Sequence, residues 1–370
     1  MPATTDKATN SSPCPLENVI EDWGNVKKRW QAWWDCQLHD RVLMCITAPR
    51  DNVSPFNLPQ VATSDKWTDV DYMIRRTRET SRTVWHGGEK LPSFVHYWSV
   101  GHALPFGCQP QFEEDTIWAS TAPIAPDGYP SFDNWHDHPW WKWMLQATQH
   151  AVNQSNGEYF VIPMWGNDAV DNLAIMRGTE QLLMDTVHNP KWVTEAVQIL
   201  SDILQEMYQE LWHCVDHGKD MPEGSITGQG CWAPGHAASF DCDTAAMVSP
   251  AIFQTMFLPP LIQTMHTVDR CLYHFDGACA LQHMDAILDT PEIHAIQWLP
   301  GSGREPIMQW VPVIERIQAK GKAVMVYVTP DEVQPLLAAV RPEGLCINTN
   351  CASEDQGRKL LDSISKRDLA

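Results

Sequence analysis

The stretch AVMVYVTPDEVQPLLAAVRPEGLCINTN, from Ala323 to Asn350, contains a complete strand–helix–strand unit. Residues 323–328 have the composition of a buried strand, and residues 344–350 repeat it. Between them, Thr329 followed by Pro330 is typical of a helix start, because threonine caps free backbone N–H groups and proline fits the first turn. Only Pro335, inside the helical stretch, argues against this helix. Two strands joined by a helix lie parallel, so the unit predicts a parallel α/β sheet.

The same alternation of strands and helices extends over most of the chain. Strand-like compositions occur at residues 42–49, 93–98, 159–166, 224–230, 271–275, 293–300, 323–328 and 344–350. Eight strands in one series predict a (β/α)8 TIM barrel, with an open two-domain α/β arrangement as the alternative. We expect a disordered polar tail over residues 1–20, then one barrel domain over residues 21–370. The Trp-rich stretch from Gly101 to Trp143 is expected to be a long loop insertion in the N-terminal half.

Composition restricts the class of protein. The chain has 370 residues, of which 44% are hydrophobic, so it can bury a sizeable core. Its formal net charge of −20 disfavours binding to nucleic acid or to anionic membranes. Eleven cysteines without a CxxC pair favour reduced thiols and a cytoplasmic location. Eighteen tryptophans are compatible with an aromatic-walled pocket or with a dimer interface.

Candidate site residues follow the predicted strands, because barrel enzymes place their active sites at the carboxyl ends of the strands. His274 and Asp276 are two residues apart in a strand, so their side chains point to the same side. Together with Cys351, after the last strand, they belong to the classes of residue that bind zinc. The alternative is that His274 forms an ordinary hydrogen bond and Cys351 is a buried thiol. The predicted substrate-binding residues are Trp165, Asn167, Asp168, Gln229, Gln297, Trp298 and Tyr327.

Several segments resemble the uroporphyrinogen decarboxylase superfamily, and most closely its methyltransferase-like branch. They are DNLAIMRGTEQLLMDTVHNPKWV (Asp171–Val193), VSPAIFQTMFLPPLIQ (Val248–Gln263), and YHFDG (Tyr273–Gly277) followed by IHAIQWLPGSG (from Ile293). The resemblance covers the chain from about residue 25 and implies a (β/α)8 barrel. It also suggests dimers. The arginine-rich N-terminal signature of the true decarboxylase is missing, which argues against a porphyrinogen substrate.

The resemblance also implies a zinc site. Corrinoid-linked and cobalamin-independent methionine-synthase-like methyltransferases hold zinc with an H-x-C motif after strand five and a cysteine after strand eight. His274 and Cys351 match this pattern, whereas Asp276 stands in place of the first cysteine. A carboxylate in place of a thiolate makes the bound metal a stronger Lewis acid, or else indicates that the metal is lost.

These observations lead to three hypotheses about function. The first is a zinc-dependent methyltransferase that moves a methyl group from a small O- or N-methylated donor to a corrinoid or thiol-like acceptor. Its catalytic residues are His274, Asp276 and Asp243, and its metal ligands are His274, Asp276 and Cys351. The chain lacks the DxHxxG corrinoid-binding signature, so a corrinoid must arrive free or on a separate protein. The alternatives are a metal-free lyase or decarboxylase of a small acid, with His274 and Asp276 as acid and base, and a non-catalytic binding barrel.

Overall fold

The computed structural model describes residue 16 and residues 20–96, 100–125, 128–163, 168–218, 222–301 and 306–365. Most of the predicted polar tail lies outside these residues. Leu16 and Ile20 are described, and both are buried in the same hydrophobic cluster as Trp30 and Trp33 of helix α2 (Trp23–Trp34). The ordered domain therefore includes at least these two positions of the tail.

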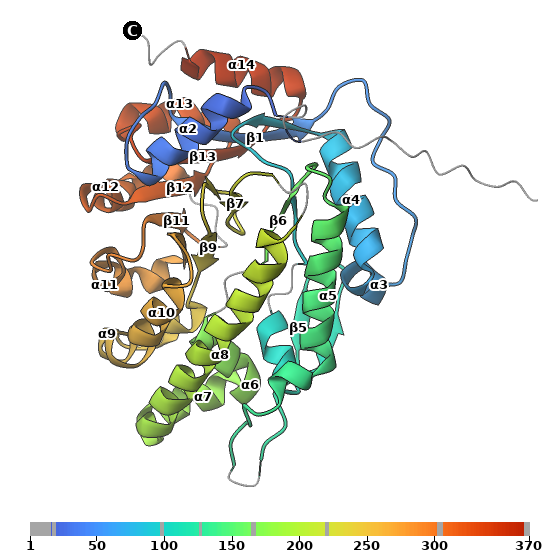
Figure 1. Cartoon of the computed structure of the whole chain (residues 1–370). Coiled ribbons are helices and arrows are strands. Elements are labelled where there is room, and N and C mark those ends of the chain that lie inside the picture. Colours follow the sequence, from blue (N-terminus) through green and yellow to red (C-terminus); the bar gives the residue numbers. More distant parts are fainter. Residues whose placement is uncertain are drawn as a thin grey trace, which may run out of the picture.

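The centre of the fold is a seven-stranded sheet in which every pair of neighbours is parallel except the pair at one edge (Figure 1). In that pair, β1 and β2 run antiparallel, and helices α3 (Thr63–Thr68) and α4 (Val70–Thr83) connect them in the sequence. In spatial order the strands are β2 (Val84–Gly88), β1 (Leu43–Pro49), β13 (Leu345–Asn350), β12 (Ala323–Tyr327), β11 (Ala295–Leu299), β10 (Arg270–Asp276) and β9 (Ala237–Phe240).

Side chains alternate between two apolar layers along these strands. In β12, Ala323 and Met325 belong to an inner cluster beneath helix α2, whereas Val324 and Val326 belong to the larger outer core. The same alternation holds in β10, where Leu272 faces inward and Tyr273 faces outward. A parallel sheet buries both faces, so the period of two separates an inner set of residues from an outer set.

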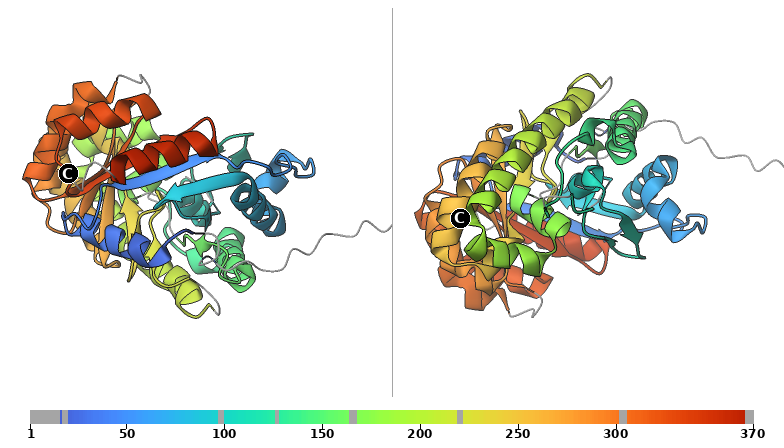
Figure 2. Two further views of the ribbon diagram at one scale, coloured as in Figure 1. Left: turned by 90° about the horizontal axis from the view of Figure 1, so that it is seen from above. Right: turned by 90° about the horizontal axis from the view of Figure 1, so that it is seen from below.

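Helices cover the outer face of the sheet. Thr329 and Glu332 form a capping box at the start of α13 (Pro330–Ala339), so the predicted helix start is confirmed even though Pro335 lies within the helix. Figure 2 shows α14 (Glu354–Ser365) lying along β1 and β2. The remaining α-helices are α3 (Thr63–Thr68), α4 (Val70–Thr83), α5 (Pro139–Gln154), α6 (Ala169–Arg177), α7 (Thr179–His188), α8 (Pro190–Asp216), α9 (Pro250–Ile252), α10 (Leu258–Met265), α11 (Met284–Leu288) and α12 (Val311–Ala319).

The fourth predicted strand is wrong. Within Gly224–Gly230, only Ser225–Ile226 (β7) is extended, and it pairs antiparallel with Trp232–Ala233 (β8). Gly230 has φ +89° and donates its N–H to the carbonyl of Thr227 at 2.8 Å, so a turn replaces the strand. The strand beside β10 is β9, whose sequence AASF has weak strand propensity and gave no signal.

The described strands form an α/β fold without a closed barrel. The large sheet ends at β2 and β9, and β3 (Ser93–Phe94) pairs with β6 (Phe160–Val161) as a separate parallel pair. The predicted loop insertion between Gly101 and Trp143 is more ordered than expected. It contains a 3₁₀ helix (Gly101–Phe106), an antiparallel pair of β4 (Pro110–Phe112) and β5 (Ile117–Ala119), and the start of α5.

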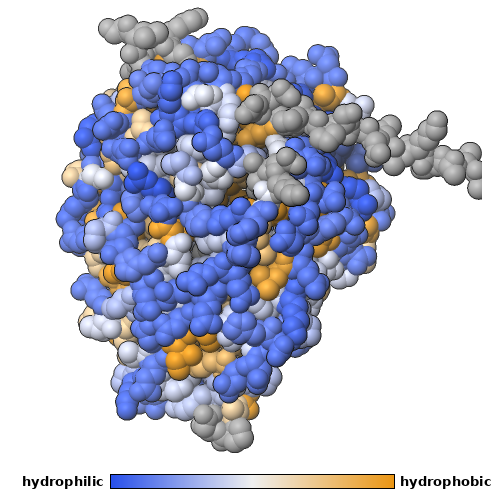
Figure 3. All heavy atoms as spheres, viewed as in Figure 1, coloured by the Kyte–Doolittle hydropathy of each residue, from blue (hydrophilic) through white to orange (hydrophobic). Residues whose placement is uncertain are grey.

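One face of the molecule is mostly polar. Figure 3 shows a hydrophilic face on which hydrophobic residues form small, separate patches. None of the helices in the described ranges combines the length and the apolar character needed to cross a membrane.

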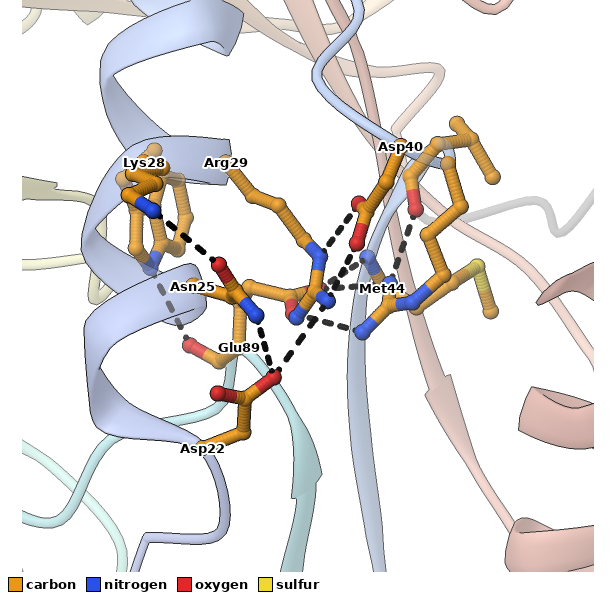
Figure 4. Close-up of polar contacts among 10 residues, drawn as sticks. Asp22, Asn25, Lys28, Arg29, Asp40, Met44 and Glu89 are labelled. Carbon is orange, nitrogen blue, oxygen red and sulfur yellow. Dashed lines mark hydrogen bonds and ion pairs between the residues drawn. The ribbon is translucent and has the colours of Figure 1, made fainter.

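A buried ion-pair network fixes α2 against the sheet (Figure 4). Glu89 is fully buried and accepts hydrogen bonds from Arg41 at 2.6 and 2.9 Å and from Arg29 at 3.0 Å. It also accepts the backbone N–H of Met44 at 2.9 Å, and Arg29 forms two further hydrogen bonds of 2.6 Å to Asp40. The network therefore joins α2, β1 and the segment after β2.

Replacing Glu89 by glutamine should lower the free energy of unfolding by about 3 kcal/mol, because it leaves the buried guanidinium group of Arg41 without its carboxylate and leaves Arg29 with only Asp40. Denaturant unfolding measures the change. Glu223→Gln is the matched control, since the exposed Glu223 pairs with Lys27 and its loss should cost much less. Equal losses in the two variants would show that the network does not stabilise the fold.

Candidate active site at the carboxyl edge of the sheet

Three polar side chains on the inner face form a row across neighbouring strands. His274 of β10 lies opposite Gln297 of β11 in the parallel register, and its Nδ1 is 2.6 Å from the Gln297 Oε1. Because an amide oxygen only accepts hydrogen bonds, Nδ1 carries the proton. Nε2 has no hydrogen bond to the described residues, so it can accept a proton or bind a metal. Tyr327 follows on β12, where its phenol lies near the Gln297 side chain. The row therefore fixes the tautomer of His274.

Two aspartates at the start of α6 form the next part of the site. Asp168 caps the helix by accepting the backbone N–H of Asp171 at 2.7 Å. Asp171 in turn accepts the N–H of Asp243 at 2.8 Å and both the N–H and the hydroxyl of Thr244, at 2.9 and 2.6 Å. These bonds hold the beginning of α6 against the segment that follows β9.

The segment after β9 adds Asp241, Cys242 and Asp243 to the site. Ligand atoms of Asp168, Asp171 and Cys242 all lie within 4.8 Å of one another, close enough to share one metal ion. Asp241 continues the inner face of β9, because Ala237 faces inward four residues earlier. Carboxylates from two distant parts of the chain therefore meet at one edge of the sheet.

The cluster contains more acidic side chains than basic ones. Burial raises the pKa of Asp168 and of Asp241 well above the usual range, and neighbouring carboxylates raise both further. Burial also raises the pKa of Asp243 to about 6, with Asp171 and Asp276 adding to the effect and His274 opposing it. His274 is the only basic side chain among the leading influences on the pKa values of these described aspartates.

Two carboxylate oxygens in the cluster have no hydrogen-bond partner among the described residues. They are Oδ2 of Asp168, whose side chain is 1% exposed, and Oδ1 of Asp241, which is 9% exposed. A buried carboxylate without a partner costs free energy unless it is protonated or bound to a cation. The cluster is therefore chemically suited to a cation, and the thiol of Cys242 favours a metal that accepts sulfur.

The structure brings some of the predicted site residues together and separates others. Asp168, Asp243, His274 and Gln297 come together at this edge, and Asp276 is exposed beside Asp243. His274, Asp276 and Cys351 are not among the groups of described side chains whose ligand atoms converge within 4.8 Å. Cys351 instead packs in the outer core at 5% exposure.

Of the other predicted substrate-binding residues, three lie in the described part of the chain and two lie outside it. Trp298 is fully buried in the outer layer, where it contacts Phe275 and Trp310, so it faces away from His274. Gln229 lies in the turn between β7 and β8, whereas Tyr327 is 45% exposed at the end of β12. Trp165 and Asn167 lie outside the described residues.

Asp171, Asp241 and Cys242 were missed in the sequence. The motif FDCD (Phe240–Asp243) contains two of them, but the fourth strand was placed too early, so this motif was not recognised as a strand end. The meeting of Asp171 with Asp243 and Thr244 depends on contacts across more than 70 residues.

Comparison with known structures identifies the fold. A solved structure of a "methyltransferase from Methanosarcina mazei" matches with a TM-score of 0.63 and 11% sequence identity, covering 93% of this chain and 99% of that chain. No protein-family model matches the sequence, and no curated protein matches it. At this level of identity, the similarity concerns the fold alone.

Replacing Asp241 by asparagine should raise the free energy of unfolding of the metal-free protein at pH 7 by about 1 kcal/mol, because it removes a buried carboxylate from an acidic cluster. Asp185→Asn is the matched control. Asp185 is also buried but bonds to Arg177 at 2.7 Å, so the same substitution should destabilise by about 2 kcal/mol. If both substitutions lower the free energy of unfolding, the negative charge of the cluster does not destabilise the protein.

Replacing Gln297 by methionine should change the tautomer of His274, because the acceptor of its Nδ1 proton is lost. We expect the Nδ1–H form in the parent chain and a shift toward the Nε2–H form in the variant, as measured by ¹⁵N NMR of the imidazole. Gln297→Glu retains an acceptor and should preserve the parent tautomer. An unchanged spectrum in the methionine variant would mean that Gln297 does not orient His274.

Proposed function

We propose that the chain is a metal-dependent methyltransferase that takes a methyl group from a small O- or N-methylated donor. The fold shared with a methyltransferase supports this reaction class. The single observation that carries the proposal is the cluster of unbalanced carboxylates beside His274 at the carboxyl edge of a parallel sheet. Enzymes with such sheets bind their substrates at this edge.

The proposed metal is zinc, with Asp168, Asp171 and Cys242 as its ligands. Oδ2 of Asp168 has no other described partner, and a cation would offset the negative charge of the cluster. A thiolate with carboxylates is a ligand set that zinc accepts, and metal binding favours the deprotonated thiol. When bound, zinc supplies Lewis acidity that polarises an oxygen, nitrogen or sulfur atom of the substrate.

The proposed role of His274 is proton transfer. When the methyl group leaves an O- or N-methylated donor, the donor atom gains electron density and takes up a proton. A thiol acceptor must release a proton as it forms the new bond to carbon. Nε2 of His274 is available to move that proton, since Nδ1 is occupied by Gln297. Asp171 and Asp243 lie close enough to stabilise the imidazolium.

The acceptor is proposed to be a corrinoid, free or on a separate protein, or a small thiol. The sequence resemblance to the methyltransferase-like branch of the uroporphyrinogen decarboxylase superfamily supports a corrinoid or thiol acceptor. Because the chain lacks a DxHxxG signature, a corrinoid would have to arrive free or on a separate protein. On the same basis we propose that the strands complete a (β/α)8 barrel, and that the protein is a dimer. The acidic surface requires any protein partner to present complementary charge.

We also propose a second possible set of metal ligands, His274, Asp276 and Cys351, on the basis of one observation. Nδ1 of His274 donates to a side-chain oxygen, which is the usual arrangement of a metal-binding histidine. The set His274, Asp276 and Cys351 would need its side chains to approach one another on binding. Variants distinguish it from the set Asp168, Asp171 and Cys242.

Metal analysis and a methyl-transfer assay test the proposal together. The purified chain should bind one equivalent of zinc and transfer methyl groups from O- or N-methylated donors to cob(I)alamin. Cys242→Ser should lose the metal and reduce transfer by at least about 100-fold, as expected when a metal ligand is lost. Cys279→Ser, at an exposed thiol, should retain both.

Two results would contradict the proposal. Zinc that is retained in Cys242→Ser but lost in Cys351→Ser would assign the metal to the second set. A metal-free, folded chain that releases carbon dioxide from a small acid would indicate a lyase instead.

A further inference from the structure

A cavity lies where β1 and β13 end, on the same edge of the sheet as the candidate active site. Its volume is about 490 Å³, which is large enough for a small organic molecule. Thr47, Arg50 and Asn350 are among its polar lining residues, and Phe56 is the largest apolar one. In the sheet, β13, β12 and β11 separate β1 from β10, so three strands lie between this cavity and the strand of His274.

Arg50 brings an unpaired positive charge to this cavity. Its Nε is a buried atom without a hydrogen bond, and its side chain forms no ion pair within 4.0 Å with any carboxylate of the described residues. The Nε–H and one terminal N–H of a guanidinium group form a fork that fits the two oxygens of a carboxylate. Arg29 uses this fork on Asp40, with two hydrogen bonds of 2.6 Å. On Arg50 the same fork lacks a described partner, so it can bind a carboxylate from outside the chain.

The acidic side chain that approaches the same loop does not form an ion pair with Arg50. Glu354 accepts the backbone N–H of Asp51 at 3.2 Å, and its other oxygen accepts two hydrogen bonds from Arg358 at 2.8 and 2.9 Å. The whole chain carries a formal net charge of −20, which repels anions in general. A local cation is therefore needed wherever this protein binds a carboxylate, and Arg50 supplies one beside an open cavity.

Asn350 adds a second hydrogen-bond donor to the cavity. The hydroxyl of Thr47 donates to Oδ1 of Asn350, so the amide nitrogen of Asn350 has two N–H groups left to donate. Backbone hydrogen bonds hold the lining in place, since Cys351 donates its N–H to the carbonyl of Thr47 and Arg50 donates its N–H to the carbonyl of Thr83, both at 2.8 Å. The cavity therefore presents donors in fixed positions, which favours a ligand that accepts hydrogen bonds.

We propose that this cavity is a binding site for a small molecule with a carboxylate group and an apolar body. The carboxylate accepts charge-assisted hydrogen bonds from the guanidinium group of Arg50 and a further hydrogen bond from the amide of Asn350. The apolar body contacts Phe56, whose side chain is half-exposed at the cavity wall. The site goes beyond the proposed methyl transfer, because none of these three residues belongs to the metal cluster or to the row of His274.

A titration of the full chain with benzoate tests the site. Calorimetry measures the affinity, and NMR follows the Nε–H resonance of Arg50, which is assigned by its loss in Arg50→Gln. Benzoate should bind and shift this resonance, and Arg50→Gln should weaken the binding by about 10-fold or more. Arg75→Gln is the matched control. It removes the same charge from an exposed arginine of α4, which pairs with Asp69 only at 3.9 Å, and it should leave the affinity unchanged.

A second variant keeps the site testable if Arg50→Gln does not fold. Asn350→Asp replaces the amide donor by a carboxylate at an exposed position, so it should also weaken benzoate binding by about 10-fold or more. The absence of benzoate binding, or equal weakening by Arg75→Gln, would overturn the site. Benzamide has the same ring without the charge, and equal affinity for it would overturn the assignment to a carboxylate. Zinc binding and methyl transfer are measured separately, so failure of this site leaves the proposed function intact.

Discussion

The candidate site depends on the alternation of side chains along parallel strands that are covered on both faces. On the inner face of β10, Leu272 lies on the side near helix α2 and His274 lies at the carboxyl edge. On β12, Met325 and Tyr327 occupy the corresponding positions. The outer positions beside these residues are apolar, as with Phe275 and Trp298. Polar groups can therefore converge at one edge while the outer core stays continuous.

Two buried clusters of charged side chains differ in how far hydrogen-bond donors and basic groups balance their negative charge. Glu89 is surrounded by donors from Arg29, Arg41 and Met44, so its charge contributes to the stability of the fold. Asp168 and Asp241 each have one carboxylate oxygen without a donor among the described residues, and neighbouring carboxylates raise the pKa of both. Stability alone does not explain an arrangement of this kind, whereas binding of a cation does.

Local chemistry made much of the fold predictable. Thr329 and Pro330 identified the start of α13, and apolar runs identified five of the seven strands of the large sheet, all except β2 and β9. The strand β9 was missed because alanine and serine resemble a loop in sequence. The contact of Asp171 with Asp243 could not be predicted, since it depends on how α6 and β9 pack. His274 and Gln297 were predicted as neighbours of the site, because adjacent parallel strands end together.

The central claim is that the carboxylates and the thiol at this edge bind a divalent metal. Anomalous X-ray scattering at the zinc absorption edge, from crystals grown with zinc, tests it most directly. The account predicts one strong peak in contact with Asp168, Asp171 and Cys242. A peak between His274, Asp276 and Cys351, or the absence of any peak at this edge, would contradict it.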